Sequence, residues 1–372
     1  MGNVPNLRFP EFSGEWENCQ IANILSIGSG RDYKHLEKGN IPVFGTGGYM
    51  TSVNECIYDG ETTFIGRKGS INKPFYYNGK FWTVDTLFYT HSFNKTTPKF
   101  VYCLFQTINW LRYNEASGVP SLSKDTIEKI KVFIPQLDEQ RKISEMLSVI
   151  DERIATQNKI IEKLQSLIRG LSDNIHRDIK GETVCFSGVG EAYSGLSGKS
   201  GDDFGDGEPF ITYMNVYQNT YISEKDYEFV QIAPNERQNC VQYGDALFTL
   251  SSETTEEVGI GAVYLGNTQK LYLNSFCFGI HFYDERVLPQ YLAHFISSFS
   301  FRKAIYPLAQ GSTRFNLQKN DFMKMKFVLP TLEEQERIAK TLDALHYCMA
   351  NEKSLLEQYI LLKRYLLSQM FI

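Results

Sequence analysis

The chain has 372 residues, which is long enough for two ordinary domains with separate cores. Hydrophobic residues make up 42% of it, and 26 Phe and 22 Tyr exclude a disordered chain and favour aromatic-rich sheets over an all-helical bundle. The net charge of −5 argues against a protein that binds nucleic acid unaided, because contacts to phosphates need Lys and Arg.

Neither the termini nor the cysteines indicate export or a metal site. The opening MGNVPNLRFPEFSGEW is unlike a signal peptide, and no run of eighteen apolar residues occurs, so we expect a soluble, cytoplasmic protein with no membrane contact. The seven cysteines are scattered without paired ligand spacing, so we expect reduced thiols and no metal.

An internal repeat organises the sequence. IPQLDEQRKISEMLSVID, from Ile134, matches LPTLEEQERIAKTLDALH, from Leu329, and the shared prolines Pro135 and Pro330 are 195 residues apart. The match extends upstream to Ser121 and Asn316, which begin corresponding segments. The chain is therefore expected to be a duplication of one unit.

The same elements are expected in the same order in each copy. Gly-rich turns and short strands come first, among them Thr62–Gly66, Asp245–Leu250 and Gly261–Gly266. Aromatic helical runs open at Pro98 and Pro289. A long helix then follows Pro135 and Pro330, with acidic residues in its first turn.

The long helices carry a heptad pattern of apolar residues, interrupted at Gln157 and Glu352. We predict that the two helices pack on each other; the alternative is that each helix covers its own domain. The predicted interface residues are Ile143, Leu147, Ile150, Ile154, Ile161, Leu164 and Ile168 in the first helix, and Ile338, Leu342, Leu345 and Leu356 in the second.

This arrangement resembles the specificity subunit of Type I restriction-modification systems along essentially the whole chain. The residues that carry the resemblance are the opening LRFPEFSGEW, the turns ASGVPSLS and AQGSTRFNL, the helix starts IPQLDEQRKI and LPTLEEQERI, and the segment PFITYMNVYQN. The resemblance implies a protein without catalytic chemistry that reads a bipartite double-stranded DNA target. Its implied partners are two modification subunits that methylate adenine and restriction subunits that translocate and cleave DNA. S-adenosylmethionine, ATP and Mg²⁺ would bind to those partners, and no cofactor to this chain.

The expected fold is mixed α/β (α+β). Two similar target-recognition domains, residues 1–135 and 181–330, would be separated by two antiparallel coiled-coil spacer helices, residues 136–180 and 331–372, with pseudo-twofold symmetry. Two other functions stay open: a DNA-methyltransferase-like enzyme, and a coiled-coil scaffold that does not bind DNA.

Three short motifs are faintly similar to catalytic or cofactor loops. Asn72–Phe75 (NKPF) has Lys where a methyltransferase NPPF loop has Pro, and Phe44–Gly48 (FGTGG) lacks the first Gly and the βαβ unit of a cofactor turn. Gly66–Ser70 (GRKGS) lacks the spacing of a nucleotide-binding loop. We therefore expect ordinary turns there and no catalytic residue.

Side chains that read DNA should be polar or cationic and should lie on rigid loops. In the first domain the candidates are Arg67, Lys68, Ser70, Ser117 and Lys124; the alternatives are a solvated basic hairpin tip and helix capping by Ser121 and Ser123. In the second domain Arg314 is the leading candidate because it follows the Gly311 turn. The further candidates there are Thr313, Asn316 and Lys319, together with Tyr213 and Asn215 on an expected strand that could equally be a half-buried sheet face.

Overall fold

The computed structural model describes residues 2–372, and their contacts group the chain into two units. Unit 1 comprises Met1–Lys159 and Lys353–Ile372, and unit 2 comprises Ile160–Glu352. Each unit combines sheets and helices around its own hydrophobic core, which confirms the predicted fold class. None of the helices in the described part of the chain is both long and apolar enough to cross a membrane.

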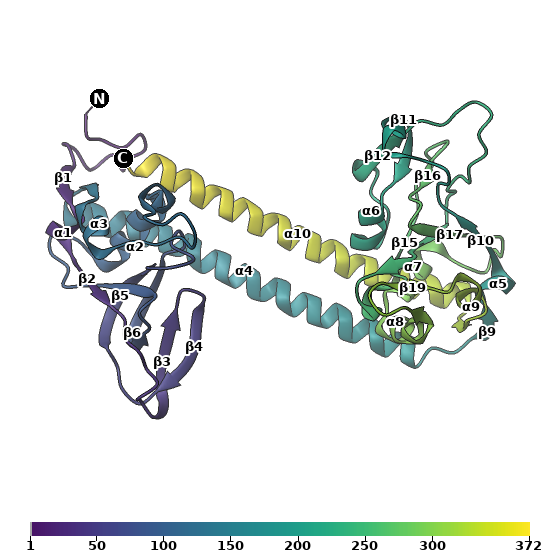
Figure 1. Ribbon diagram of the computed structural model, residues 1–372, viewed down its shortest axis with the longest axis horizontal. Coiled ribbons are helices and arrows are strands. Elements are labelled where there is room, and N and C mark those ends of the chain that lie inside the picture. Colours follow the sequence, from purple (N-terminus) through teal and green to yellow (C-terminus); the bar gives the residue numbers. More distant parts are fainter. Residues whose placement is uncertain (1) are drawn as a thin grey trace. The chain divides into compact units, whose positions relative to one another are not determined.

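Unit 1 is built on a six-stranded sheet in the order β2-β7-β5-β6-β3-β4, with a separate β1–β8 pair. Figure 1 labels strands β2, β3, β4, β5 and β6 of this sheet. Its elements are β1 (Glu17–Gln20), α1 (Ile21–Ile24), β2 (Ser26–Ser29), β3 (Lys38–Gly45), β4 (Gly48–Val53), β5 (Tyr58–Gly66), β6 (Phe75–Thr83), β7 (Leu87–His91), α2 (Pro98–Thr107), η1 (Trp110–Tyr113), α3 (Lys124–Lys129) and β8 (Lys131–Ile134).

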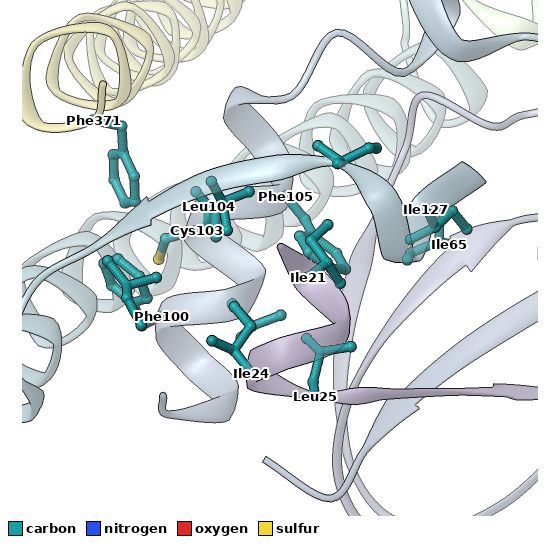
Figure 2. Packing of buried hydrophobic residues seen from close by; sticks show 14 of the residues in the cluster. Ile21, Ile24, Leu25, Ile65, Phe100, Cys103, Leu104, Phe105, Ile127 and Phe371 are labelled. Atoms are coloured by element: carbon teal, nitrogen blue, oxygen red, sulfur yellow. The ribbon is translucent and has the colours of Figure 1, made fainter. Parts of the chain in front are cut away.

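The core of unit 1 includes the last residues of the chain. Helix α2 begins after the N-cap Thr97 and buries Phe100, Val101, Leu104 and Phe105 on the side that faces the core. Phe371 stacks on Phe100 with 5.4 Å between ring centroids, and Figure 2 shows Phe371 in this cluster. Removing the C-terminal residues would therefore expose this core.

Unit 2 holds a four-stranded sheet in the order β10-β17-β13-β15 and three smaller sheets, β12-β11-β16, β14-β19-β18 and β20-β9. Its elements are β9 (Glu182–Cys185), α5 (Phe186–Val189), β10 (Gly190–Ser194), η2 (Gly201–Asp203), β11 (Phe204–Ile211), α6 (Tyr213–Gln218), η3 (Glu224–Asp226), β12 (Tyr227–Val230), β13 (Ala246–Thr249), β14 (Ser251–Ser252), η4 (Thr255–Glu257), β15 (Gly261–Val263), β16 (Tyr272–Leu273), β17 (Cys277–Phe282), α7 (Pro289–Ser297), α8 (Phe299–Ile305), η5 (Tyr306–Leu308), β18 (Ala309–Gln310), β19 (Phe315–Leu317), α9 (Lys319–Met323) and β20 (Lys326–Leu329).

Most strand pairs of unit 1 recur in unit 2. The antiparallel order β2-β7-β5-β6 of unit 1 recurs as β10-β17-β13-β15 in unit 2. The parallel pair β3–β6 recurs as β11–β16, and the pair β1–β8 recurs as β9–β20. Where unit 1 has the continuous strand β6, unit 2 has two short strands, β15 and β16, with a loop between them. The duplication seen in the sequence is thus a duplication of fold.

The two long helices are α4 (Leu137–Arg177) and α10 (Leu332–Met370). In unit 1 the first turns of α4 share a core with the last turns of α10, where Lys363 pairs with Asp151. In unit 2 the first turns of α10 share a core with the last turns of α4. The pairing is therefore antiparallel within each unit, as predicted.

The heptad residues have two roles. Ile143, Leu147 and Ile150 belong to the core of unit 1, and Ile338 and Leu342 belong to the core of unit 2. Both interpretations of the helices are therefore correct, because the same stripe covers a domain and contacts the other helix. The other predicted positions are buried (Ile161, Ile168) or half-buried (Ile154, Leu164, Leu345, Leu356).

A buried glutamine at the start of each long helix ties the helix to its domain. Gln140 accepts hydrogen bonds from the Thr97 amide and the Thr96 hydroxyl, both at 3.0 Å, and donates to the carbonyls of Pro135 (2.8 Å) and Lys95 (2.9 Å). Gln335 repeats this pattern with the Leu288 amide and the carbonyls of Pro330 and Arg286. These contacts explain why the repeated DEQ and EEQ motifs follow the prolines.

Candidate nucleic-acid interface

In unit 1, four turns meet at one place, which we call corner 1: residues 45–50, 66–70, 84–86 and 116–122. The Arg67 amide donates to the Thr86 carbonyl at 2.8 Å, and the Arg67 carbonyl accepts from the Leu122 amide at 2.9 Å. Lys68 forms a β-bridge with Ser121. The backbone thus joins the two loops that the sequence nominated separately.

The candidate side chains of corner 1 differ in their exposure and in the contacts that restrain them. Lys68, Ser70 and Ser117 are exposed. Arg67 is half-buried, because its guanidinium donates to the Asp85 carbonyl at 3.3 Å and lies 5.8 Å from the centre of the Phe88 ring. The corner therefore combines one restrained cation with exposed polar groups.

Helix α3 adds one more candidate to this side of unit 1. Its N-cap is Ser123, which accepts from the Thr126 amide, so the capping interpretation is correct for this serine. Lys124, the first helical residue, is exposed and lies 3.5 Å from Glu128. Because such a surface ion pair is weak, Lys124 can exchange this partner for a phosphate.

In unit 2 the same backbone frame forms corner 2, made of residues 212–218, 249–253, 274–276 and 309–317. The Leu250 amide donates to the Phe276 carbonyl and the Leu250 carbonyl accepts from the Leu317 amide, both at 2.8 Å. Strand β19 also pairs with β14, with Ser251 opposite Asn316. These bonds repeat those of Arg67, Thr86, Leu122 and Ser121 in corner 1.

Arg314 lies exposed in the turn of the β18–β19 hairpin. Gly311 opens this turn with φ of +140°, and a Cβ there would lie only 2.1 Å from the Arg314 carbonyl oxygen, so the turn requires glycine. Thr313 and Asn316 are also exposed in the hairpin. Lys319, at the start of α9, is half-buried, and its amine lies 3.4 Å from the Ser194 hydroxyl of β10.

The predicted strand at Tyr213–Tyr217 is wrong, because this segment is helix α6. Thr212 caps the helix by accepting from the Asn215 amide, and capping favours a helix over an extended chain. Asn215 is buried and bonds through its side chain to both the amide and the carbonyl of Ser223, so it holds the loop rather than offering its amide to a base. Tyr213 and Tyr217, one helical turn apart, stack at 6.0 Å.

The glutamate-rich loop after β13 is held by hydrogen bonds that the sequence did not reveal. Glu257 accepts from the hydroxyls of Tyr217 (2.7 Å) and Ser252 (3.0 Å), and these bonds lower the pKa of Glu257. Arg302, a half-buried residue of α8, donates to the carbonyls of Glu256 and Val258. An arginine in the apolar run FSFRKAI carries no sequence signal for this role.

Both corners also expose apolar side chains that the sequence reasoning missed. They are Tyr49, Met50 and Val119 in corner 1, and Met214 and Phe276 in corner 2. Only the position of the turns, which the structure supplies, distinguishes these residues from scattered surface apolar groups.

The motifs set aside in the sequence are structural turns. Phe44–Gly48 forms the end of β3 and its turn into β4, and Asn72–Phe75 leads into β6. Across residues 2–372, no three His, Cys, Asp or Glu side chains gather in a way that could hold a metal ion.

The fold and the two corners define a class of protein: a duplicated, mixed α/β chain in which each domain presents a polar, cation-bearing set of turns suited to nucleic-acid contacts. The family model described as Type I restriction modification DNA specificity domain matches residues 13–166 and 182–359. The chain therefore belongs to the Type I restriction modification DNA specificity family, whose role is DNA-sequence recognition.

Individual relatives are similar to this chain over most of its length. A putative type I restriction enzyme specificity subunit of Haemophilus influenzae is 22% identical over 88% of this chain and 86% of its own. A putative type I specificity subunit of Mycoplasma pneumoniae is 23% identical over 89% and 90%. The crystal structure of a type I restriction-modification S subunit from M. genitalium has the same fold, with a TM-score of 0.64, 12% identity and 99% of both chains covered.

Proposed function

We propose that this chain is the specificity subunit of a type I restriction-modification complex and that each unit reads one half of a bipartite DNA target. The observation that carries the proposal is the repetition of one backbone corner in both units, in which equivalent amides and carbonyls join equivalent turns. A duplicated frame is what two half-sites separated by an unread spacer require.

The two corners hold different side chains on this common frame. Lys68, opposite Ser121 in corner 1, is replaced by Ser251, opposite Asn316 in corner 2. At the repeat offset of 195 residues, Val119 corresponds to Arg314. Because base edges are distinguished by donor, acceptor and methyl patterns, different side chains on one frame should select different half-sites.

The modification subunits would supply the contacts to DNA phosphates for which this acidic chain is poorly suited. The net charge of −5 makes unaided DNA binding weak, so we propose that the partners provide most phosphate contacts. On α10, the apolar residues Ile360, Leu361, Leu362 and Tyr365 are exposed, which fits a helix that contacts another protein.

We assign no catalytic step and no cofactor to this chain, because the methyltransferase, cofactor and nucleotide motifs are incomplete in its sequence. Methylation with S-adenosylmethionine belongs in this proposal to two modification subunits. DNA translocation and cleavage, with ATP and Mg²⁺, belong to restriction subunits. The complex would act in the cytoplasm on double-stranded DNA.

The test is to purify the chain with its two modification subunits and to map the adenines that the complex methylates in genomic DNA. We expect two short fixed sequences separated by a spacer of fixed length and free sequence. A continuous, ungapped target would contradict the two-corner proposal. S-adenosylmethionine bound by the isolated chain would favour the methyltransferase alternative. A complex with the modification subunits that does not bind DNA at all would favour the scaffold.

A further inference from the structure

We infer that Phe276 is a base-reading residue whose ring contacts the C5-methyl group of a thymine in the second half-site, in the base pair next to that contacted by Arg314. This inference rests on the proposed function, and it names a chemical group on the DNA that corner 2 recognises.

The turn between β16 and β17 holds Phe276 rigidly and points its ring outward. The Phe276 amide donates to the Asn274 side-chain oxygen at 2.9 Å, and its carbonyl accepts from the Leu250 amide at 2.8 Å. The two residues that follow, Cys277 and Phe278, are fully buried, whereas Phe276 is 55% exposed. The two hydrogen bonds hold the backbone of this residue in place, and its exposed ring is available for an apolar contact.

Arg314 lies against this ring. Its guanidinium carbon is 5.8 Å from the ring centre, within the range of a cation–π interaction. Such a pair orders both side chains before DNA arrives, so less conformational entropy is lost on binding. Corner 2 therefore presents a planar hydrogen-bond donor and an apolar surface side by side.

In the major groove of unmodified DNA, this combination matches two specific features. Guanine offers the O6 and N7 acceptors that arginine binds bidentately, and thymine alone among the four bases carries an apolar methyl group there. Successive bases in a strand are about 3.4 Å apart, so an arginine and a ring in contact can reach neighbouring base pairs. The pair is therefore suited to a guanine beside an A·T pair.

Corner 1 differs at this point. The backbone position equivalent to Phe276 is Thr86, whose carbonyl accepts from Arg67 as that of Phe276 accepts from Leu250. Thr86 is smaller and only half-exposed. Strong methyl recognition at this position should thus be confined to the second half-site.

The experiment uses the complex of the full chain with its modification subunits and the bipartite target mapped for it. Each thymine of the second half-site, on either strand, is replaced singly by deoxyuridine, which removes only the C5-methyl group. We expect one replacement to weaken binding by about fourfold, the equivalent of one buried methyl or methylene group. The Phe276→Ala variant should bind the thymine-containing target more weakly than wild type does. In this variant, replacing the same thymine by deoxyuridine should cause no further loss of binding.

Two variants separate recognition from structure. Arg314→Ala should keep the thymine–deoxyuridine difference, because the methyl contact belongs to Phe276. Phe299→Ala removes another exposed phenylalanine of unit 2, on α8 and outside corner 2, and should behave as wild type.

The failure of this inference can be told from failure of the proposed function. If no bipartite target is found, the proposed function fails and the inference with it. If the target exists but no deoxyuridine replacement in the second half-site weakens binding, or if Phe276→Ala keeps the difference, the inference on Phe276 is overturned while the proposed function stands. A second half-site without any A·T pair would also overturn it.

Discussion

The position of Arg314 in corner 2 depends on a single glycine. Because any Cβ at Gly311 would collide with the carbonyl oxygen of Arg314, only glycine allows the turn that presents this arginine. A larger residue at position 311 would force the turn to move and would displace the Arg314 side chain within corner 2.

Arg314→Ala should reduce discrimination at one base of the second half-site by about 1–3 kcal/mol if the guanidinium binds a guanine edge. If it contacts only phosphate, binding should weaken evenly over all sequences and the salt dependence should fall by about one counterion. We favour a base contact or a mixed one. Titration of matched and singly substituted targets at several salt concentrations separates the two cases.

Arg337→Ala is the matched control, because Arg337 is an exposed arginine on α10 that pairs with Glu334. Wild-type affinity and specificity in Arg314→Ala would show that this hairpin does not contact DNA.

Gln140→Ala should lower the free energy of unfolding by about 1–3 kcal/mol, because it leaves the half-buried Thr97 amide and the buried Pro135 carbonyl without their side-chain partner. Alanine is the better helix former, so helix propensity cannot cause the loss. Urea unfolding of the full chain measures it. Gln165→Ala, at an exposed position of α4, should change little, and equal stability of the two variants would contradict the proposed clamp.

At the scale of elements, the sequence predicted the helices whose first residues follow a recognisable local pattern. The helices that begin at Pro98 and Pro289 and those that follow Pro135 and Pro330 lie where predicted. Proline in the first turn marks the first two starts, and acidic residues in the first turn mark the other two. The prediction for Tyr213–Gln218 was wrong, because the order of its polar and apolar residues fits a strand and a helix equally well. The N-cap Thr212 and packing against β13 and β15 stabilise the helix.

The packing of α7 on α10 creates a pH-sensitive contact in unit 2. His294 is buried, and burial lowers its pKa, although its 2.8 Å hydrogen bond to Asp343 opposes part of the shift. Tyr221 also donates a hydrogen bond to Asp343, and the ring of His346 lies 5.4 Å from that of His294. Burial lowers the pKa of a second histidine of unit 2, His176. Both buried histidines are therefore neutral in the folded chain at neutral pH.

Stability of unit 2 should consequently fall as the pH drops below about 6.5, where histidines of the unfolded chain bind protons that the folded state excludes. The stability is present above that pH and is lost toward the lower pKa of the folded state. Hydrogen exchange of unit 2 amides between pH 7.5 and 5.5 measures the loss. His294→Gln should reduce the pH dependence, and His35→Gln, at an exposed site in unit 1, should not. An unchanged slope in His294→Gln would contradict this assignment.

At the scale of the molecule, the duplication was visible in the sequence because the helix starts repeat nearly residue by residue. Corner 1 and corner 2 could be predicted from the sequence only in part. The loops around Arg67 and Arg314 could be nominated from their glycines and cations, but the bonds that join them to Thr86 and Phe276 cross from one turn to another. Such tertiary contacts leave no local pattern, so Phe276 and Arg302 were not predicted.

The central claim, that each unit reads its half-site independently, is tested most directly by exchanging residues 181–330 for the matching domain of a related subunit with a different known target. Methylation mapping of the complex containing this chimera should show a new second half-site, with the first half-site unchanged. Loss of both half-site sequences in a well-folded, assembled chimera, or retention of the original second half-site, would contradict the claim.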